Sequence, residues 1–342
     1  MMGTASSLQS RSAGLLQSFF KKGRAPILVL GSGPMAEKLV AFLTADQKGI
    51  KYPAPVTNFE WDTTKAHGQV SEWKRLFTIL RKEGIQIVVI ALAGRRRQLP
   101  VDLLITLRVQ GVRVVEGTTF YEEISGRVPV QLLKPTDLIF CDGFRRSPAS
   151  RFIKRLMDIC LSVLGLIGTS WAFIIFPILI KIDSKGPVFY CQERVGFKGR
   201  FFKIIKFRTM RVDAEANGAV WAEKNDPRVT PLGRFLRAKR IDEIPQLINI
   251  LFGTMSLVGP RPERETFVEQ LQKKVPFYAL RFTVKPGLTG WAQVRYNYAS
   301  TLEESQGKFE HDLYYVKHLT AWFDIKIVLK TIRVVLTGQG AR

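Results

Sequence analysis

Short apolar runs alternate with amphipathic stretches in the first third of the chain. The runs at residues 26–30, 85–92 and 112–116 are the length of strands and are bounded by polar or turn residues. Helical periodicity lies between them, at 71–83 and 101–110. Strands that alternate with helices predict an α/β fold with a parallel sheet.

The turn after the first predicted strand is rich in glycine. Residues 31–36 read GSGPMA, and an amphipathic helix follows through Leu43. This is the GxGxxA pattern of dinucleotide folds, so Gly31, Gly33 and Ala36 are candidates for cofactor contacts. The acid expected near position 56 is missing, and Glu60 comes only later. We predict a Rossmann-like accessory domain at 25–120 after a flexible arm at 1–24, and leave open whether the glycines bind a nucleotide or only let the helix pack closely.

An uncharged segment of 22 residues runs from Ile159 to Ile180, after a turn-rich linker predicted at 121–150. That length is enough to cross a bilayer. Basic residues flank both ends, and basic flanks prefer the cytoplasm. We therefore predict a re-entrant membrane helix at 151–182 that enters and returns on one face. Ser170 and Pro177 are the predicted kink residues, and the hydroxyls of Thr169 and Ser170 can bond carbonyls one turn back. A buried core helix and a single-pass anchor are the alternatives.

Charge limits the classes of partner. The chain has 52 Lys and Arg against 29 Asp and Glu, a net charge of +23, which favours an anionic partner. Three scattered cysteines without a CxxC argue against a disulfide scaffold and a structural zinc site. Nucleic acid fits poorly, because the sequence has no zinc finger, RNP signature or basic zipper and does contain the uncharged segment. We expect phosphorylated and lipid partners and no nucleic acid.

Two adjacent acids, Asp242 and Glu243, follow a strongly basic stretch. Pro245 is tolerated in the first turn of a helix and Asp is a favoured N-cap, so a helix is predicted to begin near Asp242. Main-chain amides at such a helix start attract phosphate. An adjacent Asp–Glu pair on its own is more typical of a solvated helix start. The context changes this interpretation, because guanidinium groups nearby can neutralise phosphates.

Four segments in the second half of the chain carry a family resemblance. They are KFRTM at 206–210, NDPRVTPLGRFLR at 225–237, VGPRPE at 258–263 and KPGLTGWAQ at 285–293. Together they resemble the bacterial sugar transferase family, the monotopic phosphoglycosyl transferases, from about Arg151 to the end of the chain. The segments RYNY at 295–298, DLYYVK at 312–317 and GQGAR at 338–342 resemble the exosortase-associated exopolysaccharide branch. The family often bends its hairpin with Ser-Pro, where this chain has Ser170-Trp171.

The resemblance implies a reaction and a place for it. It implies transfer of hexose-1-phosphate from a UDP-sugar to undecaprenyl phosphate with release of UMP, the first membrane step of exopolysaccharide synthesis. The expected location is the cytoplasmic face of the bacterial inner membrane, and the expected catalytic domain, also α/β, covers 183–342. A membrane-tethered nucleotide-binding regulator of polysaccharide assembly is the alternative function, and a homodimer is left open.

The resemblance also assigns residues to roles. It makes Asp242 the nucleophile that forms a covalent aspartyl-phosphosugar, and Glu243 the ligand of Mg²⁺. Direct transfer with both acids on the metal is the mechanistic alternative. The predicted substrate phosphate-binding residues are Lys206, Arg208, Arg237 and Arg261, with Asp312 predicted to contact the nucleotide.

A last amphipathic segment is predicted as a helix at 319–336. Lys326, Lys330 and Arg333 form one basic stripe beside apolar residues such as Trp322 and Leu329. Such a helix can lie in the headgroup region of a membrane or pack on the catalytic domain.

Overall fold

The computed structural model describes residues 26–44, 56–59, 70–92, 101–141, 143–144, 146–214, 226–295 and 302–337. The chain divides into two compact units, Met1–Lys134 and Pro135–Arg342. The predicted arm at 1–24 and the segments 296–298 and 338–342 lie outside the described residues.

The first unit is built on a parallel sheet of four strands in the order β2-β1-β3-β4. The strands are β1 (Ile27–Leu30), β2 (Val56–Phe59), β3 (Ile87–Ile90) and β4 (Arg113–Glu116). The helices are α2 (Pro34–Thr44), α3 (Val70–Lys82), α4 (Val101–Val109) and α5 (Gly117–Ser125). These bounds confirm the parallel sheet and the strands and helices predicted from the apolar runs.

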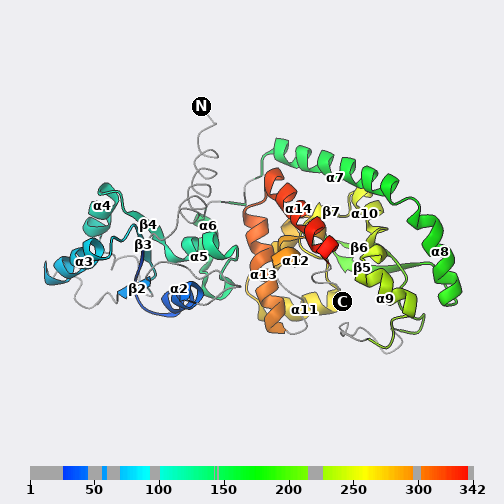
Figure 1. Ribbon diagram of the computed structural model, residues 1–342, viewed down its shortest axis with the longest axis horizontal. Coiled ribbons are helices and arrows are strands. Elements are labelled where there is room, and N and C mark those ends of the chain that lie inside the picture. The colour runs from blue at the N-terminus through cyan, green and yellow to red at the C-terminus, as the bar shows by residue number, and fades with distance from the viewer. Residues whose placement is uncertain are drawn as a thin grey trace. The chain divides into compact units, whose positions relative to one another are not determined.

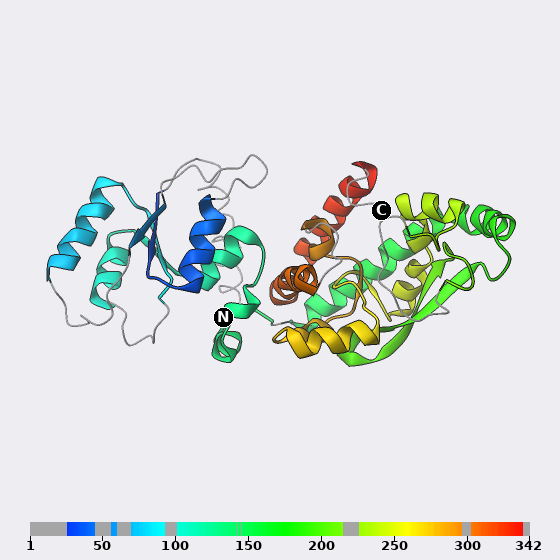
Figure 2. The same cartoon turned by 90° about the horizontal axis from the view of Figure 1, so that it is seen from below.

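Helices cover both faces of this sheet. Ile27 and Val29 point to the face that packs on α2 and α5, while Leu28 and Leu30 point to the face that packs on α3 and α4. Figure 2 shows the sheet between the two helical layers. All four of these β1 side chains are buried, as expected for a central strand between two covered faces.

The stretch at 121–150, predicted as a linker, contains regular structure. It includes the end of α5, the 3-10 turn η3 (Val130–Leu132), α6 (Pro135–Phe140) and the start of α7 (Pro148–Gly168). Tyr121 is buried and its ring lies 5.5 Å from that of Phe42 on α2. The division between the units falls after Lys134.

The second unit is a mixed α/β structure (Figure 1). An antiparallel pair joins β5 (Phe189–Val195) to β6 (Phe201–Phe207), and a parallel pair joins β7 (Ser256–Val258) to β8 (Gly287–Thr289). Around them lie α8 (Ala172–Asp183), α9 (Pro231–Ala238), α10 (Gln246–Phe252), α11 (Glu265–Lys274), α12 (Trp291–Arg295), α13 (Leu302–Lys317) and α14 (Ala321–Thr337). The 3-10 segments are η4 (Phe197–Gly199), η5 (Ile241–Glu243) and η6 (Tyr278–Thr283).

Helices α7 and α8 form a pair bent by 61°. The break lies at Thr169–Trp171, where the Thr169 hydroxyl donates to the Gly165 carbonyl at 2.6 Å, as predicted. Ser170 therefore lies at the bend. Pro177 lies inside α8, so the prediction that it helps to make the main bend is wrong. In Figure 1 the pair runs along one side of the second unit, past α10 and α9.

Polar groups anchor the first half of α7 to the rest of the second unit. Arg155 donates to the carbonyls of Ile250 and Leu251 at 2.7 Å each, at the end of α10. Buried Asp158 accepts from the Leu257 amide at 3.0 Å. Positive charge is favourable at a helix C-terminus, so Arg155 suits this position.

The remaining surface of the pair is strongly apolar. Among the described residues no single helix is long and apolar enough to cross a bilayer, whereas α7 and α8 together meet that test. Large exposed side chains line both helices and the break: Phe152, Ile153, Leu156, Leu161, Val163, Leu164, Ile167, Trp171, Ile174, Ile175, Ile178, Leu179 and Ile182. A buried core helix would not expose so many, and a contiguous apolar surface of this kind indicates a membrane or protein contact.

Candidate active site

The two adjacent acids lie in the 3-10 turn η5, between α9 and α10. Arg240, just before the turn, adopts a left-handed conformation with φ of 54°. Helix α10 begins only at Gln246, and its N-cap position is Pro245. The prediction that Asp242 caps a helix is therefore wrong. The tighter turn instead leaves both carboxylates without a capping role.

Helix α10 places this turn beside strand β6. Asn249 on α10 donates to the Lys203 carbonyl at 2.8 Å and accepts from the Ile205 amide at 3.0 Å. Both groups belong to β6, whose next residue is Lys206. One side chain thus fixes the distance between the acidic turn and the basic end of the strand.

Glu243 is surrounded by cations. Arg261 Nη2 donates to its Oε1 at 2.6 Å, and Lys206 Nζ lies 3.6 Å from the same oxygen. Arg240 Nη1 lies 3.5 Å from Oε2. Burial alone would raise the pKa of Glu243, but the charges of Arg261 and Lys206 outweigh it and hold this pKa well below its usual range. Glu243 is therefore a fixed anion.

Asp242 has the opposite electrostatic character. It is 8% exposed, and burial raises its pKa to about 6, with the charge of Glu243 acting in the same direction. Lys206, Arg237 and Arg261 lower this pKa but do not cancel the rise. Among the residues that the structure describes, no hydrogen bond to its carboxylate is seen. Asp242 thus faces cations without being tied to one.

Two of the predicted basic residues have different surroundings from Lys206 and Arg261. Arg237 donates through Nε to the Thr209 hydroxyl at 2.9 Å, and its charge still acts on Asp242. Arg208 donates to the carbonyl and hydroxyl of Ser184 at 2.7 and 2.9 Å, after the end of α8. The structure therefore brings Lys206, Arg237 and Arg261 to the acids, and directs Arg208 towards the chain that follows α8.

Close main-chain packing presents Arg261. Strands β7 and β8 are parallel neighbours, so the sequence motifs VGPRPE and KPGLTG meet in space. Side chains at Gly259 or Gly287 would collide with the main chain of the opposite motif. The Gly259 amide donates to Thr289 and the Gly287 amide to Pro260, both at 2.9 Å. This contact fixes the root of the loop that carries Arg261.

Asp312 is not among the residues around the acids. It lies on α13, 2% exposed, with Oδ2 3.2 Å from Arg281 Nη2. Burial raises its pKa to about 6, against the opposing charge of Arg281. Arg281 and Arg240 are polar residues of this region that the sequence did not single out. Arg240 could have been found, because it lies three residues before Glu243 on a turn.

The metal prediction can be compared with the available donors. In the described parts of the chain no group of three His, Cys, Asp or Glu side chains could hold a metal ion. Mg²⁺ commonly uses only one or two carboxylates and takes its other ligands from water and substrate phosphates. The adjacent pair offers two carboxylates, and burial, followed by the charge of Glu243, raises the pKa of Asp242, so a bound cation would be electrostatically favourable beside the pair. The donor set is thus compatible with Mg²⁺ bound together with a phosphorylated substrate.

The glycine-rich turn of the first unit is explained by packing. A side chain on Gly31 would lie 2.7 Å from the main chain of Ala91, at the end of β3. Gly33 has φ of 103°, and Ala36 is buried in the core. These observations favour the close-packing interpretation of the motif.

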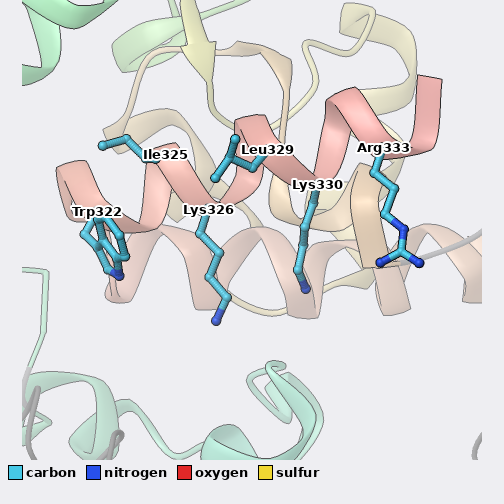
Figure 3. Close-up of a pocket in the computed structure, with 6 residues that line it drawn as sticks. All are labelled: Trp322, Ile325, Lys326, Leu329, Lys330 and Arg333. Carbon is cyan, nitrogen blue, oxygen red and sulfur yellow. The ribbon is translucent and has the colours of Figure 1, made fainter. Parts of the chain in front are cut away.

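Helix α14 carries a shallow groove on its exposed side. Figure 3 shows Lys326, Lys330 and Arg333 extending from the same side of the helix. Trp322 is 75% exposed and Leu329 62% exposed in the same groove. Burial lowers the pKa of Lys330 to about 8, with neighbouring cations adding to the effect. The surface combines apolar side chains with crowded positive charge.

Most of the second unit matches a known protein family. Residues 149–338 match the family described as bacterial sugar transferase. The chain is 46% identical over 221 residues to a UDP-N-acetylgalactosamine-undecaprenyl-phosphate N-acetylgalactosaminephosphotransferase of Aeromonas hydrophila, covering 65% of this chain and 52% of that protein. It is 42% identical over 213 residues to the UDP-glucose:undecaprenyl-phosphate glucose-1-phosphate transferase of Escherichia coli (strain K12), covering 62% and 44%.

A third match also includes the first unit. The undecaprenyl-phosphate glucose phosphotransferase of Komagataeibacter xylinus is 33% identical over 323 residues, covering 92% of this chain and 60% of that protein. This chain thus spans between 44% and 60% of the length of these three relatives.

Proposed function

The chain belongs to the bacterial sugar transferase family, and we propose that it transfers hexose-1-phosphate from a UDP-sugar to undecaprenyl phosphate with release of UMP. The observation that carries this proposal is the difference in electrostatic environment between two adjacent buried acids. Glu243 is held by Lys206, Arg240 and Arg261. Asp242 faces two of these cations and Arg237, with a raised pKa and no bond to its carboxylate among the described residues.

The first step of the proposed reaction follows from this difference between the two acids. The Asp242 carboxylate attacks the phosphorus that carries the sugar, and the bond from that phosphorus to the bridging oxygen breaks. UMP leaves with the electron pair, and an aspartyl-phosphosugar remains. With a pKa of about 6, Asp242 is mostly ionised at neutral pH and can act as the nucleophile.

The second step regenerates the enzyme. An oxygen of undecaprenyl phosphate attacks the same phosphorus, the bond to Asp242 breaks, and the lipid carries the sugar away as a diphosphate. Both steps join anions, so Lys206, Arg237 and Arg261 are placed to neutralise phosphate oxygens as negative charge collects. Their positive charge already acts on Asp242 in the free enzyme.

Glu243, the neighbour of the Asp242 nucleophile, would hold Mg²⁺. When bound, the ion would supply further neutralisation of the donor diphosphate. The short contact between Arg261 and Glu243 keeps this carboxylate ionised, which is the form that binds a divalent cation.

We propose that the α7–α8 pair is the membrane anchor, entering the cytoplasmic face of the inner membrane and returning to it. The exposed apolar side chains of the pair, the bend of 61° and the basic residues on both sides support this topology. Because the pair also packs on α10 and α9, it would place the active site near the membrane surface, where the lipid phosphate lies. The groove on α14 fits an anionic headgroup region.

We propose that the first unit is a Rossmann-like accessory domain. The parallel sheet with helices on both faces supports a doubly wound fold of this class, although the strand order β2-β1-β3-β4 matches the flavodoxin-like order and not the classic Rossmann order.

The reaction can be tested with the purified full chain in nanodiscs that contain undecaprenyl phosphate. A panel of UDP-sugars is supplied with Mg²⁺, and UMP release is measured together with lipid-linked sugar. We expect at least one donor to give equal amounts of both products. Dinucleotide binding without any UMP release across the panel would instead support the regulator.

A further inference from the structure

We propose that Asp312 and Arg281 are positioning residues that hold the main chain of Arg261, and so set the place of its guanidinium beside Glu243. This inference rests on the proposed function, in which Arg261 neutralises substrate phosphate. It gives Asp312 a different role from the direct nucleotide contact that the sequence predicts.

Arg281 is the centre of the contact. Its Nη2 donates to the carbonyl of Arg261 at 2.7 Å and lies 3.2 Å from Asp312 Oδ2. Its Nη1 donates to the Tyr278 hydroxyl, and its guanidinium lies 4.9 Å from the Tyr278 ring centre. Arg281 is 5% exposed and Asp312 2% exposed. A planar guanidinium can bind these three groups at once because its donors have fixed directions.

The carboxylate of Asp312 is too deeply buried to bind substrate directly. A carboxylate that is 2% exposed and already paired has little surface to offer a nucleotide. Two residues, however, connect it to Glu243. Arg281 binds both Asp312 and the Arg261 carbonyl, and the Arg261 side chain binds Glu243 at 2.6 Å. The carboxylate of Asp312 therefore acts on the site through Arg261.

A second set of contacts, made by Glu263, restrains the loop that carries Arg261. Glu263 is bound by Lys308 at 2.9 Å, from the same helix as Asp312, and its carbonyl accepts from the Val195 amide at 3.1 Å. The positive charges of Lys308 and Arg281 hold the pKa of Glu263 at about 2, although burial alone would raise it. Helix α13 thus restrains the loop on both sides of Pro262. Asp312 acts through Arg281 on the Arg261 carbonyl, and Lys308 binds Glu263.

Loss of the positioning contact should weaken catalysis without removing a reacting group. In Asp312→Asn the Arg281 charge loses its partner and its hold on the Arg261 carbonyl loosens. A displacement of about 1 Å in a catalytic group can cost about 100-fold in rate, so we expect kcat/KM to fall on that order.

A double-mutant cycle separates positioning from general stability. Transfer activity is measured for Asp312→Asn, for Arg261→Gln and for the double variant. If Asp312 acts through Arg261, the double variant is no slower than Arg261→Gln alone. Asp324→Asn is the matched control, because Asp324 is also a buried, paired acid of the second unit, and its partners Lys154 and Tyr315 bind the carbonyl of Val258 in β7, whereas Arg281 binds the carbonyl of Arg261 itself. Its effect should multiply with that of Arg261→Gln. Equal losses from Asp312→Asn in both backgrounds, or no loss in the wild-type background, would overturn the proposal.

Amide hydrogen exchange keeps the test independent of activity. The amides of Arg261, Glu263 and Arg264 should exchange faster in Asp312→Asn than in the wild type, and should change much less in Asp324→Asn, because the partners of Asp324 bind the main chain at Val258 instead. If Asp312→Asn does not fold, Arg281→Lys serves instead, because a single ammonium group cannot bind all three partners. Faster exchange in an enzyme without transfer activity would contradict the proposed function alone, whereas unchanged exchange would contradict the positioning role.

Discussion

Asp242 and Asp324 are both buried aspartates of the second unit, but they differ in whether their carboxylates are bound by neighbouring groups. Asp324 on α14 accepts from Lys154 Nζ at 2.7 Å and from the Tyr315 hydroxyl at 2.8 Å, and it is completely buried. No such bond to Asp242 is seen within the described ranges of the chain. Burial raises the pKa of both acids, and the charge of Lys154 opposes the rise at Asp324.

The comparison separates an acid that stabilises the fold from an acid that is available for chemistry. A buried carboxylate with all its bonds made ties two elements together, here α7 and α14. A buried carboxylate that faces cations without bonding them keeps its lone pairs for an incoming phosphorus. Four changes should break or sharpen this contrast.

The largest effect is expected from Asp242→Asn. The amide cannot form the phosphosugar ester, so kcat should fall on the order of 10⁴-fold or more. Because the native carboxylate loses no bond, the midpoint of thermal unfolding should stay the same or rise. Activity and unfolding are measured on the same preparation. Near-normal turnover in this variant would remove covalent catalysis at Asp242.

Lys154→Met reverses this pattern. It leaves Asp324 buried without its cation, so the free energy of unfolding should fall by about 3–5 kcal/mol. Thermal unfolding in detergent gives the direction, and transfer activity per folded molecule should fall far less than in Asp242→Asn. A stable variant with lost catalysis would mean that the two acids are wrongly distinguished.

The pH dependence of kcat/KM should show the raised pKa of Asp242. The nucleophile must be ionised, so the rate should fall about tenfold for each unit of pH below about 6 and level off above it. In Lys206→Met this limb should move to higher pH, because Lys206 lowers the pKa of Asp242 in the wild type. A limb that does not move would show that Lys206 does not act on the nucleophile.

The smallest effect concerns cations that lie on the surface. Lys326→Gln/Arg333→Gln on α14 should weaken binding to anionic vesicles by about 1 kcal/mol per charge, and less in high salt. The exposed pair Lys273→Gln/Lys274→Gln on α11 is the control with the same change in charge. Equal losses in the two variants would show that the total charge matters and the groove does not.

Periodicity and motif order predicted much of the architecture. The strands and helices of the first unit follow from short apolar runs, because a sheet covered on both faces buries every residue of its central strand. The hydroxyls of Thr169 and Ser170 predicted the bend, and the Thr169 hydroxyl bonds the Gly165 carbonyl there. The prediction that Pro177 contributes to the main bend was wrong, because a proline within a helix does not always mark the main kink.

The active site was predictable as a set of residues but not as a geometry. Sequence placed Asp242, Glu243, Lys206, Arg237 and Arg261 in motifs, and the structure brings them together. The unequal pKa values of the two acids depend on burial and on distances between side chains, which no spacing rule gives. Arg281 binds the main-chain carbonyl of Arg261, 20 positions away in the sequence. Every residue has such a carbonyl, so a sequence does not show which one a side chain binds.

The most direct measurement is the intact mass of the purified enzyme after incubation with a donor and Mg²⁺ in the absence of lipid phosphate. The wild type should gain the mass of one hexose phosphate, located on Asp242 by peptide mapping, and lose it when undecaprenyl phosphate is added. Rapid formation of lipid-linked sugar with no heavier species at any time would contradict the aspartyl intermediate.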